Sequence, residues 1–419
     1  MAKKKITLEE AVVNDISYEI PKNWLMIKLG YLGKWGSGGT PSRIHPEYYE
    51  GKIPWIKTGE LNNGYIYDAE ENITEDAINN SSAKIFKKDS VLIAMYGATI
   101  GKVAILGIDA TTNQACAAIE CNEGVIDNKF MFYYLLSQKE NFIELGKGGA
   151  QPNISQMIIK EYKCPVPPLK EQQRIVNKIE SLFEKLDKAN ELIEEAREDF
   201  EKRKSAVVYK IINKFGNKKI KLKKCIRFIT DKKEPVDGDV YIGLENMGKS
   251  IGIISYSMAE NVKSTKTKFD KGDILYGRLR PYLDKHDVAD RSGICSTDIL
   301  VMRANEKFEA RYIDYILGTL ELIRYANENS LGINLPRVSA KVLGEYEILD
   351  IEFDKQKIVV EILNKIFEDE DKIEKLTQLE EQVELIKKSI LTKAFRGKLG
   401  TNCEDDESVL ELLKERLNT

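Results

Sequence analysis

The sequence predicts an α+β protein in which two globular, mixed α/β domains are separated by two long antiparallel helices that form a coiled coil, arranged as an internal pseudo-two-fold repeat. Three observations predict this fold class. The chain of 419 residues is too long for one small core. Related segments recur about 183 residues apart, and each copy ends in a long stretch with apolar residues at helical spacing. Hydrophobic residues make up 42% and charged residues 31%, which is typical of a globular protein in water.

The internal repeat is carried by segments that match at almost constant offsets. The matching segments are Phe86–Leu92 with Phe269–Leu275, Gln173–Val176 with Gln356–Val359, and Asn153–Ser155 with Arg337–Ser339. Chance matches would scatter in offset, whereas these agree to within one residue. The pattern therefore indicates a duplicated structural unit.

The repeat divides the chain into five parts. We expect a first globular domain over 1–165, a first helix over 166–215, a second globular domain over 216–350, a second helix over 351–399, and an acidic tail with a short helix over 400–419.

Two long helices follow the globular stretches. The prolines of Pro165–Pro168 suit a helix start, and Asp354 is expected to cap the second helix. The first helix has an apolar seam at Ile175, Ile179, Leu182, Leu186, Ala189, Ile193, Ala196 and Phe200, and the second at Ile358, Ile362, Ile366, Ile373, Leu376, Leu379, Val383, Ile386 and Ile390. Two seams of matching length predict that the helices pack on each other. The alternative is two independent helices that each cover their own domain.

The globular stretches alternate between short strands and helices. We expect strands at Val91–Met95 and Lys102–Leu106, with Ile274–Tyr276 and Ile299–Arg303 as their counterparts, and helices at Lys129–Leu136 and Tyr312–Leu322. The turns that follow the first strand of each set are the places where polar side chains gather.

Composition limits the chemistry available. Six cysteines without a CxxC pair predict a reduced, cytoplasmic protein without structural zinc. Two histidines, His45 and His286, leave little room for histidine-based catalysis. The net charge is −3, but residues 216–291 carry 17 basic and 11 acidic side chains, so a locally basic surface remains compatible with nucleic-acid binding.

A glycine-rich loop over residues 35–43 has the composition of a phosphate-binding loop. It lacks the Gly-Lys-Ser/Thr ending that supplies a lysine and a magnesium ligand, which argues against a nucleotide site. Its Thr40, Ser42 and Arg43 are candidate contacts to a DNA backbone.

Matching turns in the two repeats carry different polar side chains. The turn after residue 95 presents Tyr96, Thr99 and Lys102, and the turn after residue 277 presents Arg278, Arg280, Tyr282 and Lys285. Arginine can read guanine bidentately, and tyrosine and lysine can hold phosphates. A solvated hairpin is the alternative. The same turn with different side chains in the two repeats is what we expect of two domains that read different DNA sequences.

A second pair of matching turns spans residues 146–155 in the first repeat and 331–339 in the second. Its candidate contacts are Lys147, Gln151 and Asn153 in the first repeat, and Asn334 and Arg337 in the second. Glycine and proline make both segments turns. A purely structural turn explains any single one of these residues equally well.

Catalytic signatures are missing from the sequence. No Asn-Pro-Pro-Tyr or Asp-Pro-Pro-Tyr segment and no Walker motif is present, which disfavours an adenine methyltransferase and an ATP-driven translocase. Glu370-Asp371-Lys372 has the carboxylate-x-lysine spacing of some nucleases, but it falls within a predicted charged helix. We therefore expect no catalytic site and no metal site in this chain.

Several of these segments together resemble the specificity subunit of type I restriction-modification systems. They are residues 36–43, Ile53–Ile56, Gln151–Ser155, Pro165–Val176 and Ser389–Leu399. The resemblance covers nearly the whole chain, and Pro-Pro-Leu-x-Glu-Gln-x-Arg-Ile-Val is its most specific segment. The second repeat departs from this pattern over residues 350–359, where the prolines are lost.

The resemblance implies a non-catalytic DNA reader whose two target-recognition domains each read one half of a bipartite, asymmetric site. It also implies partners: double-stranded DNA, two methyltransferase subunits that bring S-adenosylmethionine, and restriction subunits that use ATP and magnesium. The competing hypotheses are a coiled-coil interaction protein without a DNA role and a part of a single-chain restriction-methylation enzyme.

Overall fold

The computed structural model describes residues 8–13, 18–146, 153–260, 264–367, 371–403 and 405–411. The chain forms two compact units. Met1–Lys188 with Val383–Thr419 forms unit 1, and Ala189–Gln382 forms unit 2. Each unit takes in part of both long helices, so this grouping differs from the five parts drawn from the sequence, whose limits stay a prediction.

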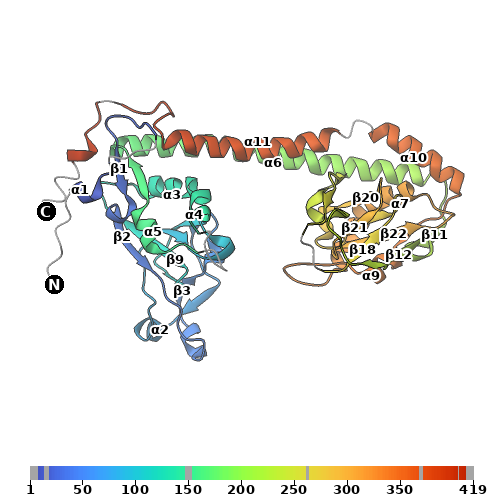
Figure 1. Cartoon of the computed structure of the whole chain (residues 1–419), viewed down its shortest axis with the longest axis horizontal. Helices are drawn as coiled ribbons and strands as arrows, with labels where there is room; N and C mark the ends of the chain where they lie inside the picture. The colour runs from blue at the N-terminus through green and yellow to red at the C-terminus, as the bar shows by residue number, and fades with distance from the viewer. Residues whose placement is uncertain are drawn as a thin grey trace. The chain divides into compact units, whose positions relative to one another are not determined.

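Unit 1 contains three sheets (Figure 1). A five-stranded sheet has the order β2 (Gly33–Ser37), β9 (Cys116–Cys121), β6 (Val91–Ala94), β7 (Val103–Leu106) and β4 (Tyr65–Ile66). A three-stranded sheet has the order β5 (Glu71–Ile73), β3 (Ile53–Ile56) and β8 (Thr111–Thr112), and β1 (Leu25–Lys28) pairs with β10 (Lys163–Val166). Strands β6 and β7 are buried along their whole length, which explains why both read as unbroken apolar runs.

Short helices cover the sheets of unit 1. They are α1 (Leu8–Ala11), α2 (Glu75–Asn79), α3 (Asn128–Ser137), α4 (Lys139–Leu145) and α5 (Gln156–Glu161). The side chains of Asp127 and Ser155 cap α3 and α5 by accepting hydrogen bonds from the backbone N–H groups of Phe130 and Ile158. Helix α3 buries Phe130 and Met131 against the five-stranded sheet, and this contact forms the centre of the unit's core.

Unit 2 contains a similar set of elements (Figure 1). One sheet has the order β12 (Ile226–Ile229), β22 (Ile299–Ala304), β19 (Ile274–Gly277) and β20 (His286–Val288). Another has the order β13 (Lys232–Lys233), β18 (Lys266–Phe269), β21 (Gly293–Cys295), β14 (Val240–Ile242) and β17 (Ser257–Met258). The pairs β11 (Lys219–Lys221) with β23 (Glu347–Leu349) and β15 (Met247–Gly248) with β16 (Gly252–Ile253) complete the strands. The helices are α7 (Ala310–Leu317), α8 (Leu320–Glu328) and α9 (Ala340–Glu345).

The repeat predicted from the sequence is also present in the pairing of individual strand residues. In β6 and β9, Leu92 lies opposite Ala118, and in β19 and β22, Leu275 lies opposite Val301, at the same offset of 183. The predicted counterparts are partly wrong, because β22 corresponds to β9, and β20 is the counterpart of β7. Strand β20 is not recognisable from apolar pattern, because its only apolar residue is Val288.

Two buried glutamines repeat an entire hydrogen-bond pattern at the start of the long helices. The Gln172 side-chain amide donates to the carbonyls of Val125 and Pro167, and its oxygen accepts from the N–H of Asp127. Gln356 makes the equivalent three bonds to Lys307, Ile351 and Glu309. Because both side chains are fully buried, each glutamine ties a long helix to the capping residue of α3 or α7.

The long helices are α6 (Leu169–Ile212), α10 (Phe353–Phe367) and α11 (Asp371–Ala394), with residues 368–370 outside the described part. Within unit 1, Arg174 of α6 bonds the carbonyl of Thr401, and Asp187 pairs with Lys387 at 2.8 Å. Within unit 2, Arg197 pairs with Glu380 at 2.7 Å. Further along α6, the ammonium group of Lys204 lies 5.5 Å from the ring centre of Phe367. In both units the contacts run in opposite chain directions, so the helices pair antiparallel, as the sequence predicts.

The predicted apolar seams are confirmed in part. The predicted positions that are buried are Ile175, Ile179, Ile193, Val383 and Ile390, whereas other predicted positions are exposed. In α6, Arg197 is 2% exposed whereas Ala196 is exposed. In α10, Val359 and Leu363 are buried, whereas Ile358 and Ile366 are 46% and 48% exposed. In α11, Leu379 and Ile386 are also exposed, while the side chain of Ile373 lies outside the described residues. A seam predicted from hydrophobicity alone leaves out a buried charged residue such as Arg197, whose charge is paired with Glu380.

Smaller differences concern the ends of helices. The expected helix Tyr312–Leu322 is two helices, α7 and α8, separated by Gly318 and Thr319. Pro165 and Val166 belong to strand β10, so α6 begins only at Leu169. In the tail, residues 409–411 are helical, and residues 404 and 412–419 lie outside the described part.

Candidate nucleic-acid interface

The turn between β19 and β20 holds four of the candidate residues in unit 2. It contains a short 3-10 helix, Pro281–Leu283, flanked by Arg280 and Asp284. The backbone N–H of Arg280 donates to the carbonyl of Pro336 at 2.7 Å, and that of Arg278 to the carbonyl of Asp298 at 2.8 Å. Two neighbouring loops therefore fix the path of this turn.

The backbone of the turn is strained at two positions. Arg280 has a φ of 52° and Asp284 a φ of 48°, both in the left-handed region. The corresponding positions of unit 1, at the offset of 183, are Gly97 and Gly101, with φ of 63° and 76°. Non-glycine residues in this region cost about 1 kcal/mol or more each. Unit 2 thus keeps an arginine and an aspartate at positions where the backbone favours glycine.

The candidate side chains of this turn lie in different environments. Tyr282 is 47% exposed and Arg280 is exposed. Arg278 is partly buried, and its Nε has no hydrogen-bond partner among the described residues. The ammonium group of Lys285 donates to the carbonyl of Leu244 at 2.7 Å, and burial lowers its pKa. Arg280 and Tyr282 are the two side chains of the turn that are presented to solvent.

The second candidate segment of unit 2 packs along this turn. Arg337 and Leu279 form a β-bridge, and the guanidinium of Arg337 bonds the carboxylate of Asp298 at 2.8 Å. Asn334 is exposed in the same segment, beside the fully exposed Ile333. The structure therefore brings the two sets of candidates in unit 2 together, a proximity that the sequence did not predict.

Unit 1 has the same arrangement with other side chains. Tyr96 is 44% exposed and forms a β-bridge with Asn153, which is exposed as well. The hydroxyl of Thr99 donates to the carbonyl of Tyr96 at 2.8 Å, and Lys102 is half-buried. The candidates Lys147 and Gln151 lie outside the described residues.

The loop with Thr40, Ser42 and Arg43 is held by its own contacts. The guanidinium of Arg43 lies 3.8 Å from the ring centre of Tyr49 and pairs with Glu71 at 2.7 Å. The hydroxyl of Thr40 donates to the side-chain oxygen of Gln114, and the hydroxyl of Ser42 accepts from the backbone N–H of Ile44 at 3.4 Å.

The glycines of this loop have a structural explanation. A Cβ atom on Gly38 would lie 2.0 Å from the carbonyl oxygen of Thr112, and one on Gly39 would lie 2.4 Å from the backbone nitrogen of Ala83. Close backbone packing therefore requires both glycines.

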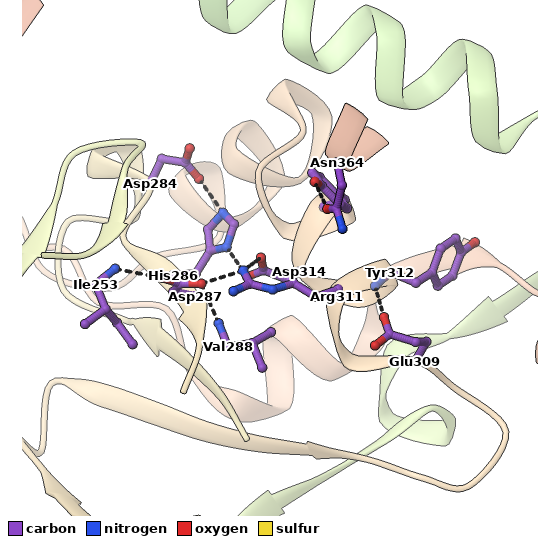
Figure 2. A network of polar contacts seen from close by, with 11 residues as sticks. Ile253, Asp284, His286, Asp287, Val288, Glu309, Arg311, Tyr312, Asp314 and Asn364 are labelled. Carbon is purple, nitrogen blue, oxygen red and sulfur yellow. Dashed lines mark hydrogen bonds and ion pairs between the residues drawn. The ribbon is translucent and has the colours of Figure 1, made fainter. Parts of the chain in front are cut away.

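Sequence reasoning missed a buried ionic cluster behind the turn of unit 2. Figure 2 shows the imidazole of His286 between the carboxylates of Asp284 and Asp314, with Arg311 beside Asp287. The cluster borders a cavity of about 440 Å³. The one signal in the sequence was the rarity of histidine, since the chain has only two.

Other chemistry receives no support from the described residues. Within them, no three His, Cys, Asp or Glu side chains are grouped so as to bind a metal ion. Burial raises the pKa of Cys116 and Cys225 to about 12, which makes both thiols poor nucleophiles at neutral pH. None of the helices in the described part is long and apolar enough to cross a membrane.

Comparisons with known proteins agree with this architecture. Residues 21–198 match the family described as type I restriction modification DNA specificity domain. The MjaIX specificity subunit of Methanocaldococcus jannaschii is 36% identical over 185 residues, which are 42% of this chain and 42% of that protein. The MjaVIII specificity subunit of the same organism is 23% identical over 412 residues, covering 91% of this chain and 94% of the relative.

A solved structure shows the same fold. A chain of the structure described as the structural basis of complex assembly and conformational transition of the type I R-M system superposes with a TM-score of 0.59 at 18% identity. The match covers 91% of this chain and 100% of that one. Residues 21–198 thus match the type I DNA specificity domain, and over most of its length the chain is similar to specificity subunits of type I restriction enzymes.

Proposed function

We propose that this chain is the sequence-specific DNA-binding subunit of a type I restriction-modification complex and that it reads a bipartite, asymmetric site. One observation carries the proposal: the two units build the same exposed turn and present different side chains from it. Tyr96 and Asn153 in one unit correspond in position to Leu279 and Arg337 in the other. Duplicated scaffolds with divergent side chains suit two half-sites of different sequence.

The long helices are proposed as the spacer between the half-sites and as the docking surface for two methyltransferase subunits. Large apolar side chains on their surfaces support the docking role. These are Leu192 and Tyr209 on α6, Ile358 and Ile366 on α10, and Leu379, Leu385 and Ile386 on α11. Restriction subunits would join this assembly. In this proposal the partner subunits bind S-adenosylmethionine, ATP and magnesium. This chain itself is non-catalytic.

The proposal predicts that the purified chain neither methylates nor cleaves DNA by itself, because it lacks methylase and Walker signatures. Mixed with its methyltransferase subunits, it should shift duplexes from a random pool and enrich a split motif. The measurement combines electrophoretic mobility shift with transfer of labelled methyl groups. Methyl transfer by the chain alone would support the single-chain enzyme instead, and absence of any DNA binding in the assembly would support the interaction protein.

We expect Arg280 to read one half-site only. Replacing it by alanine should cost about 1–3 kcal/mol of discrimination at the half-site read by unit 2 and leave the other half-site unchanged. Arg280→Gly should lose the same discrimination without loss of thermal stability, because glycine accepts the φ of 52°.

The matched control is Arg291→Ala, since Arg291 is an exposed arginine of unit 2 that pairs with Asp290. Binding of single-base variants of each half-site by the assembled complex measures the effect. Equal discrimination in Arg280→Ala, Arg291→Ala and the unmodified chain would remove Arg280 from the interface.

A further inference from the structure

The buried ionic cluster of unit 2 lies directly behind the turn that carries Arg280. His286 Nε2 lies 3.0 Å from Asp284 Oδ1, and His286 Nδ1 lies 2.7 Å from Asp314 Oδ1. The three side chains are only 10–12% exposed. Both ring nitrogens face carboxylates, so both serve as donors when the imidazole carries its second proton.

The two carboxylates belong to different parts of the unit. Asp284 ends the turn that carries Arg278 and Arg280, and it is one of the two strained residues of that turn. Asp314 lies on α7, whose apolar face enters the core of unit 2. His286 itself begins β20. The imidazole therefore connects a strained turn with a helix that packs into the core of the unit (Figure 2).

The surrounding charges favour the protonated ring. Besides Asp284 and Asp314, the titratable and charged groups that border it are Tyr276 of β19, Asp287 of β20, Arg311 of α7 and Lys204 of α6. Arg311 is engaged with Asp287 at 2.5 Å and with Asp314 at 3.1 Å. Burial opposes a charge on His286, but the two carboxylates outweigh it and raise the pKa of His286 to about 10.

Unit 1 shows that the fold does not need this cluster. Val103 of β7 lies opposite Ile93 of β6, just as His286 of β20 lies opposite Tyr276 of β19. Val103 therefore takes the place of His286. Counting from the capping residues Asp127 and Glu309, Phe132 of α3 takes the place of Asp314. Val103 and Phe132 are both buried. The same helix packs on the same strand through apolar contacts, and there the left-handed positions of the turn are glycines.

We propose that His286, as an imidazolium, is the positioning residue that holds the turn 278–285 of unit 2 in the conformation that reads its half-site. The cluster compensates for strain that glycine avoids in unit 1, and it leaves Arg280 free to carry a functional side chain. This inference rests on the proposed function, because it names the group that shapes one of the two reading surfaces.

The test compares His286→Gln with His45→Gln in complexes assembled with the methyltransferase subunits. Glutamine keeps hydrogen-bonding capacity but cannot carry the charge. His45, the other histidine, is exposed in unit 1 and pairs with Glu47, so it is a matched control. We expect His286→Gln to lose about tenfold in discrimination at the half-site of unit 2, equal to about 1.4 kcal/mol, and to keep discrimination at the other half-site.

A pH series of the unmodified complex gives a test without substitutions. A histidine whose pKa is raised on folding contributes fully below pH ~6.5 and loses its contribution as the pH rises through the folded value. Discrimination at the half-site of unit 2 should therefore persist at pH 7–8 and decline toward pH 10. The other half-site serves as the internal reference. In His286→Gln, discrimination at the two half-sites should depend on pH in the same way.

The outcomes distinguish failure of this inference from failure of the proposed function. If the unmodified complex shows no sequence preference, the proposed function is wrong. If it reads both half-sites and folded His286→Gln reads them equally well at every pH, His286 does not position the turn. Nuclear magnetic resonance of the two histidines, assigned with His45→Gln, adds a direct check: titration of His286 near pH 6.5 would overturn the inference even if the variant failed to fold.

Discussion

Lengthening both long helices by four residues should widen the gap between the recognised half-sites by one or two base pairs and leave the half-site bases unchanged. Four residues extend a helix by about 6 Å and rotate the downstream residues by about 40°, whereas one base pair rises about 3.4 Å. This expectation rests on the proposed spacer role of the helices.

The structure improves the choice of insertion point. A position between Glu194 and Glu195 lies near the middle of α6, but Glu194 borders the buried Arg197 and pairs with Lys249 at 3.6 Å. Insertions after Lys188 and after Gln382 fall at the limits of the two compact units. Neither insertion separates Arg197 from Glu380, because both of these residues lie within unit 2. Methylation-site mapping reports the gap, and altered bases with an unchanged gap would contradict the spacer role.

Arg197→Ala should destabilise the helix pair of unit 2 by about 3–5 kcal/mol, the range measured when one partner of a buried ion pair is removed. The guanidinium of Arg197 pairs with Glu380 at 2.7 Å and lies 3.4 Å from the hydroxyl of Thr377. Burial raises the pKa of Glu380, and the neighbouring Glu194 adds to this effect. Without the arginine, two carboxylates would face each other beside the space left by the truncated side chain.

Hydrogen exchange of peptides that cover residues 189–204 measures this effect locally, because a chain with two units need not unfold in one step. The matched control is Arg203→Ala, an exposed arginine further along the same helix, with an expected cost below about 0.5 kcal/mol. The double variant Arg197→Met with Glu380→Met should recover much of the loss, since an apolar pair avoids the cost of buried charge. Equal protection in all three variants would show that the ion pair contributes nothing.

The repeat and the pairing of the long helices could be predicted because they depend on pattern. Offsets near 183 residues survive in the strand register and in the bonds of Gln172 and Gln356. Apolar periodicity marks a helix well. It does not determine which face of the helix is buried. Arg197 is buried because it pairs with Glu380, whereas Ile358 and Ile366 are exposed.

The candidate site was predictable only in outline. Glycine, proline and polar residues predict the turns at Tyr96 and Arg280. The structure places the second candidate segment of each repeat beside the corresponding turn. The strain at Arg280 and Asp284 and the ionic cluster at His286 could not be recognised, because both depend on backbone angles and on side chains brought together from distant parts of the chain.

The central claim is that this chain supplies the sequence specificity, with each unit reading its own half-site. Genome-scale mapping of methylated bases in DNA treated with the methyltransferase subunits, with and without this chain, tests it most directly. We expect one asymmetric split motif with a fixed gap in the presence of the chain and no motif without it. The same methylated motif in the absence of the chain, or a single continuous motif in its presence, would contradict the account.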